Sequence, residues 1–188
     1  VDHQGWCNDL AMVKFEQTRS GYDTCWVIAA SSGCNCGYTY GGNTHAPESM
    51  TPKIQELLFL TMERLGRVEK AAYPHGCNIN RYEPGQQLGW HRDNEEILKR
   101  GDSSTDTTLI IATSVGGFGE FGLRPWSKKK RLGKSIQAIG QHRTIQPGDV
   151  IAMTGNLQST AEHMAKNHVS YTHLPLPTTN PMQIYVDA

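Results

Sequence analysis

Two histidines and one aspartate form the pattern in this sequence that is most informative about chemistry. His91 and Asp93 stand two positions apart, and His163 follows much later in the chain. Residues two apart in an extended segment point to the same side, so the first pair can reach one ion. Two imidazoles and a carboxylate suit a mononuclear non-haem iron(II), which keeps positions open for dioxygen and a co-substrate. The pattern predicts that His91, Asp93 and His163 bind a catalytic metal.

Turn signals stand beside both halves of this pattern. Pro84 and Gly85 lie directly upstream of His91, so we expect a strand, a turn and a second strand there rather than a helix. The run 147–149, Pro-Gly-Asp, likewise opens a short apolar strand, and Gly155 turns the chain back toward the later histidine. The candidate ligands are therefore expected on or beside strands.

One helix is expected, over residues 51–66. Thr51 can cap it, Pro52 suits its first turn, and Gly66 stands where a helix ends. The positions expected on one face are Ile54, Leu57, Leu58, Thr61 and Leu65.

Most of the remaining pattern is typical of short strands separated by Gly, Pro, Asn and Ser clusters. The expected strands are residues 24–30, 77–82, 107–113, 120–124, 149–154 and 182–186. No helices alternate with the later strands, which disfavours a parallel doubly wound sheet. We expect a mainly β, α+β chain: an antiparallel sandwich or jelly roll with a helix packed outside.

Length and charge limit the possible partners. The 188 residues fit a single domain, 1–188, and 18 basic against 18 acidic residues produce no global field that would attract polyanions. Contact with nucleic acid would need a local patch, and residues 128–131, extended by Arg124 and Lys134, are the candidate. An ordinary solvated loop is an equally good interpretation of that run.

Five cysteines indicate a reducing compartment, so we expect thiols and a cytoplasmic protein. A zinc site at Cys25, Cys34 and Cys36 is a weaker alternative, because Cys-x-Cys lacks the usual ligand spacing. No apolar run reaches the roughly 18 residues of a membrane span, and the N-terminus has no signal pattern. The start at Val1 indicates a piece of a longer protein.

Several motifs together resemble the AlkB family of Fe(II) and 2-oxoglutarate-dependent dioxygenases. The matching positions, in chain order, are Asn80, Tyr82, Gly85, Leu88, His91, Asp93, Glu95, the strand 148–153 and His163. Residues 37–42 and the following helix are similar to that family's substrate lid and helix, and residues 116–124 to its Gly-to-Phe-x-x-Arg strand pair. The resemblance covers roughly residues 20–165.

The resemblance implies a double-stranded β-helix of the jelly-roll, cupin-like kind. Residues 76–188 would form this core, and residues 20–75 the lid and the helix. Iron(II), 2-oxoglutarate and dioxygen would be the cofactors, and Asn80 and Tyr82 would hydrogen-bond 2-oxoglutarate. A strand amide and a core tyrosine are the alternative interpretation of that pair. His168 and His173 compete as third ligand, but only His163 lies at a family-like distance from the 148–153 strand.

The implied reaction is oxidative demethylation of N-alkylated bases in RNA or single-stranded DNA. Such a base must be flipped out, stacked on flat side chains and recognised at its edge. Tyr38 and Tyr40 are the candidates for stacking, although tyrosines near glycines are also ordinary loop anchors. Arg92 and Glu95 are further substrate-binding candidates, with Glu95 accepting from an exocyclic amine. We expect a monomer with no membrane partner.

The sequence departs from the family where two arginines should follow the third ligand. The strand 182–187 carries none, and no arginine follows Arg143. The first family arginine clamps the far carboxylate of 2-oxoglutarate, and such a carboxylate is costly to bury without a cation. Three explanations stay open: the arginine lies beyond Ala188, another base such as Lys166 or Arg143 substitutes, or 2-oxoglutarate binds weakly or not at all.

Two other functions are therefore also consistent with the sequence. One is a hydroxylase of a protein side chain or a small metabolite on the same fold. The other is a degenerate binding module that has lost co-substrate capture.

Overall fold

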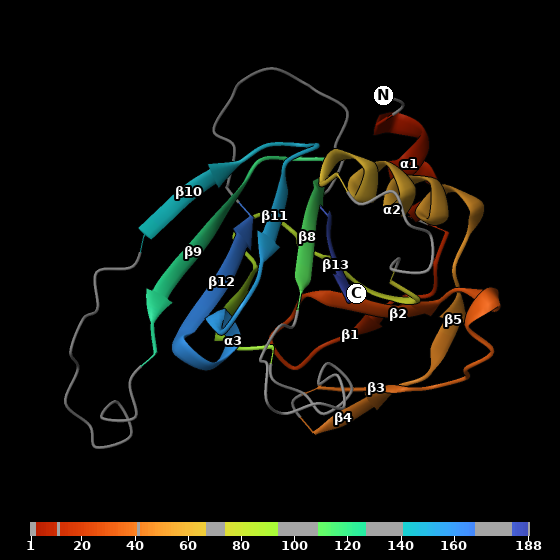
Figure 1. Ribbon diagram of the computed structural model, residues 1–188, viewed down its shortest axis with the longest axis horizontal. Coiled ribbons are helices and arrows are strands. Elements are labelled where there is room, and N and C mark those ends of the chain that lie inside the picture. Colours follow the sequence, from red (N-terminus) through yellow and green to blue (C-terminus); the bar gives the residue numbers. More distant parts are fainter. Residues whose placement is uncertain are drawn as a thin grey trace.

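Two facing β-sheets form the centre of the fold in the computed structural model (Figure 1). The structure describes residues 3–10, 12–40, 42–66, 74–93, 109–126, 141–167 and 182–187. Glu95, the run 128–131, Lys134, His168 and His173 lie outside the described residues. The predictions made for them stay predictions.

The larger sheet has seven strands in the order β1-β2-β6-β13-β8-β11, with β5 paired to β2. These strands are β1 (Glu16–Gln17), β2 (Asp23–Ile28), β5 (Pro47–Ser49), β6 (Gly76–Arg81), β8 (Ile110–Val115), β11 (Val150–Met153) and β13 (Met182–Asp187). All pairings are antiparallel except that of β5 with β2. The early segment therefore supplies strands to the sheet in addition to the helix.

The smaller sheet has four antiparallel strands in the order β10-β9-β12-β7. They are β7 (Gln87–His91), β9 (Gly119–Pro125), β10 (Gln141–Ile145) and β12 (Ala161–Asn167). A separate hairpin pairs β3 (Tyr38–Tyr40) with β4 (Asn43–His45). A single helical turn, α3 (Leu157–Thr160), directly precedes β12.

Helix α2 (Pro52–Arg64) forms where the capping and stop residues predicted it. The Thr51 hydroxyl accepts a hydrogen bond from the Ile54 N–H at 3.3 Å, which satisfies one exposed donor of the first turn. Gly66 adopts φ 71°, a left-handed conformation that glycine tolerates best. Helix α1 (His3–Leu10), which was not predicted, packs beside α2 through Trp6 and Leu10.

The helices cover one face of the larger sheet. The buried apolar side chains between the helices and this face come from α1, α2, β2, β6 and β8. They are Trp6, Leu10, Cys25, Val27, Ile54, Leu57, Leu58, Met62, Cys77, Ile79, Ile111 and Val115. Side chains alternate along a strand, so the neighbouring residues point to the space between the sheets. Even the polar pair Thr61 and Thr113 on the helix face is satisfied, by a hydrogen bond of 3.3 Å.

A second core lies between the two sheets. It joins side chains of β7, β8, β9, β10, β11 and β12 with two tyrosines near the ends of β2 and β6: Tyr22, Tyr82, Leu88, Ile110, Ala112, Phe121, Ile145, Met153 and Ala165. This arrangement confirms the predicted mainly β fold class and agrees with the double-stranded β-helix. The metal-ligand candidates lie on the inner face of the smaller sheet.

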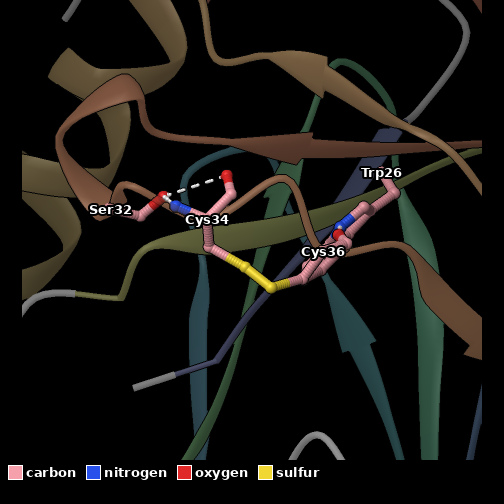
Figure 2. The surroundings of a disulfide bond; sticks show 4 residues. All are labelled: Trp26, Ser32, Cys34 and Cys36. Carbon is pink, nitrogen blue, oxygen red and sulfur yellow. Dashed lines mark hydrogen bonds between the residues drawn. A yellow bond between two sulfur atoms is a disulfide. The ribbon is translucent and has the colours of Figure 1, made fainter.

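The prediction that the cysteines are all thiols was wrong for one pair. Cys34 and Cys36 form a disulfide, with their Cα atoms 5.4 Å apart (Figure 2). The Cys34 N–H donates to the Ser32 hydroxyl at 3.1 Å, and the Trp26 indole N–H donates to the Cys36 carbonyl at 2.9 Å. These hydrogen bonds flank the short loop that the disulfide closes.

Cys25 and Cys77 are buried free thiols, as predicted. Burial raises the pKa of Cys25 to about 12, and Glu48 and Glu16 add to the effect. A thiol with so high a pKa is neutral and unreactive near pH 7. Within the described residues, no cysteine belongs to a group that could hold a metal ion. No helix of the described chain is long and apolar enough to cross a membrane.

Candidate metal centre

Strand pairing brings the three predicted metal ligands together. His91 is the last residue of β7, and the register of the antiparallel pair sets it opposite His163 of β12. Asp93 lies two residues further on, and the ligand atoms of all three side chains lie within 4.8 Å of one another. The Asp93 carboxylate faces both imidazoles, with Oδ1 3.3 Å from His91 Nε2 and Oδ2 3.1 Å from His163 Nε2.

Local contacts orient each imidazole. His91 Nδ1 lies 2.8 Å from the Gly89 carbonyl oxygen. A carbonyl can only accept, so Nδ1 carries a proton, and Nε2 is the nitrogen that faces the carboxylate and could bind a metal ion. The His163 ring stacks on Phe121 with centroids 5.7 Å apart and is almost fully buried. The register of β7 against β12 shifts just after His163, an irregularity that changes how side chains are aimed.

The electrostatics of the site favour the forms that bind metal. Burial alone would raise the pKa of the Asp93 carboxyl, but the facing imidazoles of His163 and His91 outweigh it and hold the pKa well below its usual range. Burial lowers the pKa of His163, against the attraction of Asp93. An ionised carboxylate and a neutral imidazole are the states that coordinate a metal. Among the described residues, this is the group whose donors could share one ion.

The two predicted co-substrate residues are both buried on the inner side of the larger sheet. Asn80 of β6 is 1% exposed and Tyr82 is 2% exposed. Asn80 Oδ1 accepts from the Thr24 hydroxyl at 2.8 Å and from Asn78 Nδ2 at 3.4 Å. The oxygen of Asn80 is thus engaged, and its amide nitrogen is the part that can donate to a bound oxygen ligand.

The two predicted stacking tyrosines lie in different environments. Tyr38 is buried and stacks on Trp26 with centroids 5.0 Å apart. Tyr40 is half-buried, lies parallel to Tyr38 at 6.3 Å, and meets the His91 ring edge-on at 6.1 Å. The geometry therefore puts Tyr40 beside the metal-ligand candidates, whereas Tyr38 supports it from behind.

Arg92 points away from the metal-ligand candidates. Its guanidinium lies 4.0 Å from the centre of the Trp126 ring, a cation–π contact with the end of β9. A matching contact of 4.1 Å joins Arg124 to Trp90. Both pairs link β7 to β9 across β12. They lie opposite the metal ligands because side chains alternate along β7.

The outer face of the smaller sheet is a tightly packed surface that sequence reasoning missed. Arg124 also pairs with Glu162 at 2.7 Å, so its charge is neutralised locally. The Trp90 ring lies so close over Gly122 that a Cβ added there would sit 2.8 Å from a ring carbon. The spacing of these residues in the sequence offered no signal, because their contacts depend on the order of the strands.

Residues 182–187, where the AlkB resemblance would place an arginine, form strand β13 in the middle of the larger sheet. It pairs with β6 and β8, with Gln183 in register with Asn80 and with Ser114. Among the arginines whose side chains the structure describes, Arg81 forms an ion pair with Asp23 at 2.7 Å, and Arg92 and Arg124 make the contacts given above. These three arginines are engaged with other side chains, so they do not identify the cation that would pair with 2-oxoglutarate.

Comparisons with known proteins agree with this geometry. The family model of the 2OG-Fe(II) oxygenase superfamily matches residues 2–173. Among curated protein sequences, none matches this chain.

Two solved structures have a fold similar to that of this chain. The structure of OsALKBH1 is 13% identical in sequence, with a TM-score of 0.59. The match covers 99% of this chain and 91% of the OsALKBH1 chain. An oxidoreductase of the 2OG-Fe(II) oxygenase family from Burkholderia pseudomallei is 13% identical in sequence, with a TM-score of 0.54. The match covers 100% of this chain and 77% of the Burkholderia chain. At these identities the likeness concerns the fold alone.

Proposed function

Because this chain belongs to the 2OG-Fe(II) oxygenase superfamily, we propose that it oxidatively demethylates N-alkylated bases in RNA or single-stranded DNA. The superfamily uses iron(II), 2-oxoglutarate and dioxygen, and the two imidazoles and one carboxylate gathered here are a donor set that suits iron(II). When bound, these cofactors supply the oxidant for a C–H bond. A hydroxylated N-methyl group then leaves as formaldehyde and restores the base.

Some side chains would bind the iron, and others would orient the co-substrate. His91, Asp93 and His163 would hold iron from one side, which leaves the opposite side for co-substrate and dioxygen. The contact of His91 Nδ1 with the Gly89 carbonyl already directs Nε2 toward the site. Asn80 and Tyr82 would donate to oxygen atoms of 2-oxoglutarate from the inner face of the larger sheet.

The observation that carries the substrate proposal is the position of Tyr40. Its ring lies 6.1 Å from the ring of His91 and stands on the hairpin that resembles the family's lid. A flipped base needs flat side chains on which to stack next to the reacting centre. Tyr38 and Trp26 behind it form a stacked support that holds Tyr40 in place. Such stacking favours an unpaired base over an aliphatic substrate.

Turnover of a defined oligonucleotide tests the proposal. Protein with iron(II), ascorbate and 2-oxoglutarate should release formaldehyde from a 1-methyladenine oligonucleotide. Tyr40→Ala should reduce this release about 10-fold or more, since stacking of one base is worth roughly 1–3 kcal/mol. Tyr40→Phe should retain most activity, and Thr39→Ala, an exposed neighbour, serves as the control. The proposal would be refuted if the unaltered protein released no formaldehyde and no methylated base stimulated its consumption of 2-oxoglutarate.

A hydroxylase of a protein side chain or small metabolite is the second candidate. The observation that favours it is the ion pair of Arg124 with Glu162, because Arg124 is the described member of the predicted phosphate-binding patch. A nucleic acid enzyme should bind oligonucleotides with an affinity that falls steeply with salt. Failure to retard oligonucleotides at low salt, together with 2-oxoglutarate turnover on peptides or metabolites, would favour this candidate.

The absent arginine of β13 keeps a non-catalytic module as a further outcome. Calorimetry with 2-oxoglutarate and metal-loaded protein separates it from both enzymes. Measurable binding supports an enzyme, and no binding at millimolar co-substrate supports the module.

A further inference from the structure

Gln158 is a buried polar side chain next to the metal-ligand candidates. It belongs to the single turn α3 and stands five positions before His163. Its side chain is only 5% exposed. The carboxamide oxygen accepts a hydrogen bond of 3.0 Å from the Asp93 N–H, and the carboxamide nitrogen lies 3.7 Å from Met153 Sδ. A buried amide with both ends engaged has a defined orientation.

This hydrogen bond joins the two segments that carry all three candidate ligands. The paired register of β7 with β12 ends at His91, so the Asp93 backbone lies beyond the ladder. Gln158 contacts that backbone from the segment leading into His163. The bond therefore links residues 65 positions apart at the point where strand pairing stops.

Helix α3 is itself fixed, so Gln158 acts from a rigid support. The Thr160 carbonyl accepts from the Trp126 N–H at 2.8 Å, which ties the end of α3 to the end of β9. The Thr160 hydroxyl and the Ser159 hydroxyl both donate to the Asn156 carbonyl, at 3.0 Å and 2.8 Å. These contacts restrict the position of the short turn on both sides.

We propose that Gln158 is a positioning residue that sets the place of the Asp93 carboxylate relative to the two imidazoles. Its carboxamide contacts the Asp93 backbone and Met153, so it would act on a bound metal through Asp93 and not as a ligand. Partners that orient metal ligands in this way typically contribute 10- to 100-fold to metal affinity. The inference rests on the metal centre of the proposed function and is independent of the substrate.

Gln158→Met tests the role, because methionine has a similar length and lacks the oxygen that accepts from Asp93. Chelator-treated protein is titrated with cobalt(II), whose visible absorption reports the geometry of its ligands. The dissociation constant for cobalt(II) should rise about 10- to 100-fold, and the visible bands should change shape. The matched control is Thr61→Val, which removes the buried hydrogen bond of Thr61 with Thr113 on the far face of the larger sheet. That control should leave the cobalt affinity within about 2-fold of the unaltered protein.

The outcomes separate this inference from the proposed function. Cobalt binding by Gln158→Met within 2-fold of the unaltered protein, with unchanged bands, overturns the positioning role. No cobalt binding by the unaltered protein overturns both the role and the metal centre. Cobalt binding without release of formaldehyde from methylated bases refutes the demethylase proposal alone.

A second measurement decides the matter if Gln158→Met does not fold. Hydrogen exchange of the Asp93 amide is followed in the unaltered, metal-free protein. Strong protection of this amide supports the bond to Gln158 as a fixed feature. Exchange at the rate of an exposed amide overturns the proposal.

Discussion

The two faces of the larger sheet are built from the same strands and differ in the polar groups that they bury. Toward the helices, β2, β6 and β8 present apolar side chains such as Val27, Ile79 and Ile111. Toward the smaller sheet, the same strands bury polar ones such as Thr24 and Asn80. Burying polar groups costs free energy unless they find partners. The difference teaches that the helix face is almost entirely apolar core, whereas the inner face adds buried polar groups to an apolar core of its own.

Ile79→Ala should produce the largest loss of stability on the helix face. Ile79 is fully buried, so the change removes apolar contacts and leaves a cavity that costs about 2–5 kcal/mol of the free energy of unfolding. Urea unfolding measures this loss. Cobalt affinity of the folded variant should stay within about 2-fold, and a larger change would show that the two faces are not independent.

Asn80→Ala, one residue along the same strand, should have the reverse profile. Hydrogen bonds to charged groups contribute about 1.5–3 kcal/mol, so loss of the amide should raise the KM for 2-oxoglutarate about 10- to 100-fold. The Thr24 hydroxyl keeps Asn78 Oδ1, 3.0 Å away, as an acceptor, so the stability loss should be smaller than for Ile79→Ala. The comparison of faces fails if the KM is unchanged and the variant unfolds as readily as Ile79→Ala.

Acid should lower the free energy of unfolding of the metal-free protein because groups of the candidate site titrate. The buried thiol Cys25 on the helix face should contribute nothing to this pH dependence. Burial lowers the pKa of His163, so the unfolded chain takes up this proton first as the pH falls through about 6.5. Stability should therefore fall from pH 7.5 toward pH 5. Asp93, with its lowered pKa, adds a further loss only below about pH 4. Cys25 of the helix face stays neutral throughout, since its pKa is raised to about 12.

Urea unfolding in a chelating buffer at pH 7.5 and pH 5 measures this effect. His163→Asn should show a smaller pH dependence than the unaltered protein, because asparagine does not titrate. An unaltered protein that is equally stable, or more stable, at pH 5 would contradict the assignment of a buried neutral imidazole.

Local signals in the sequence predicted the elements whose ends are marked by capping or turn residues. Helix α2 begins after Thr51 and ends before Gly66, because capping and chain reversal depend on adjacent residues. The first metal-ligand segment was also predictable, since the His-x-Asp pair and the turn at Pro84 and Gly85 are local patterns. Strand β12 was not predicted, because its Ala, Glu and Lys residues have low strand propensity and pairing on both sides determines its conformation.

Features that depend on distant contacts stayed hidden. Gln158 stands in a single helical turn with no motif, and its role follows from a contact with Asp93. Arg92 was expected at the substrate, but the order of strands in the smaller sheet brings it over Trp126 instead. The Cys34 and Cys36 disulfide depends on the local bend at Ser32, which the cysteine count did not reveal.

An anaerobic titration tests the metal centre most directly. Iron(II) is added to the metal-free protein, followed by 2-oxoglutarate, and the weak visible band of the iron chelate is recorded. His91, Asp93 and His163 should bind one iron per chain and leave adjacent positions for the co-substrate, so the band should appear with the unaltered protein and be lost in His91→Ala. No band with the unaltered protein, or an equal band in His91→Ala, would contradict the assignment.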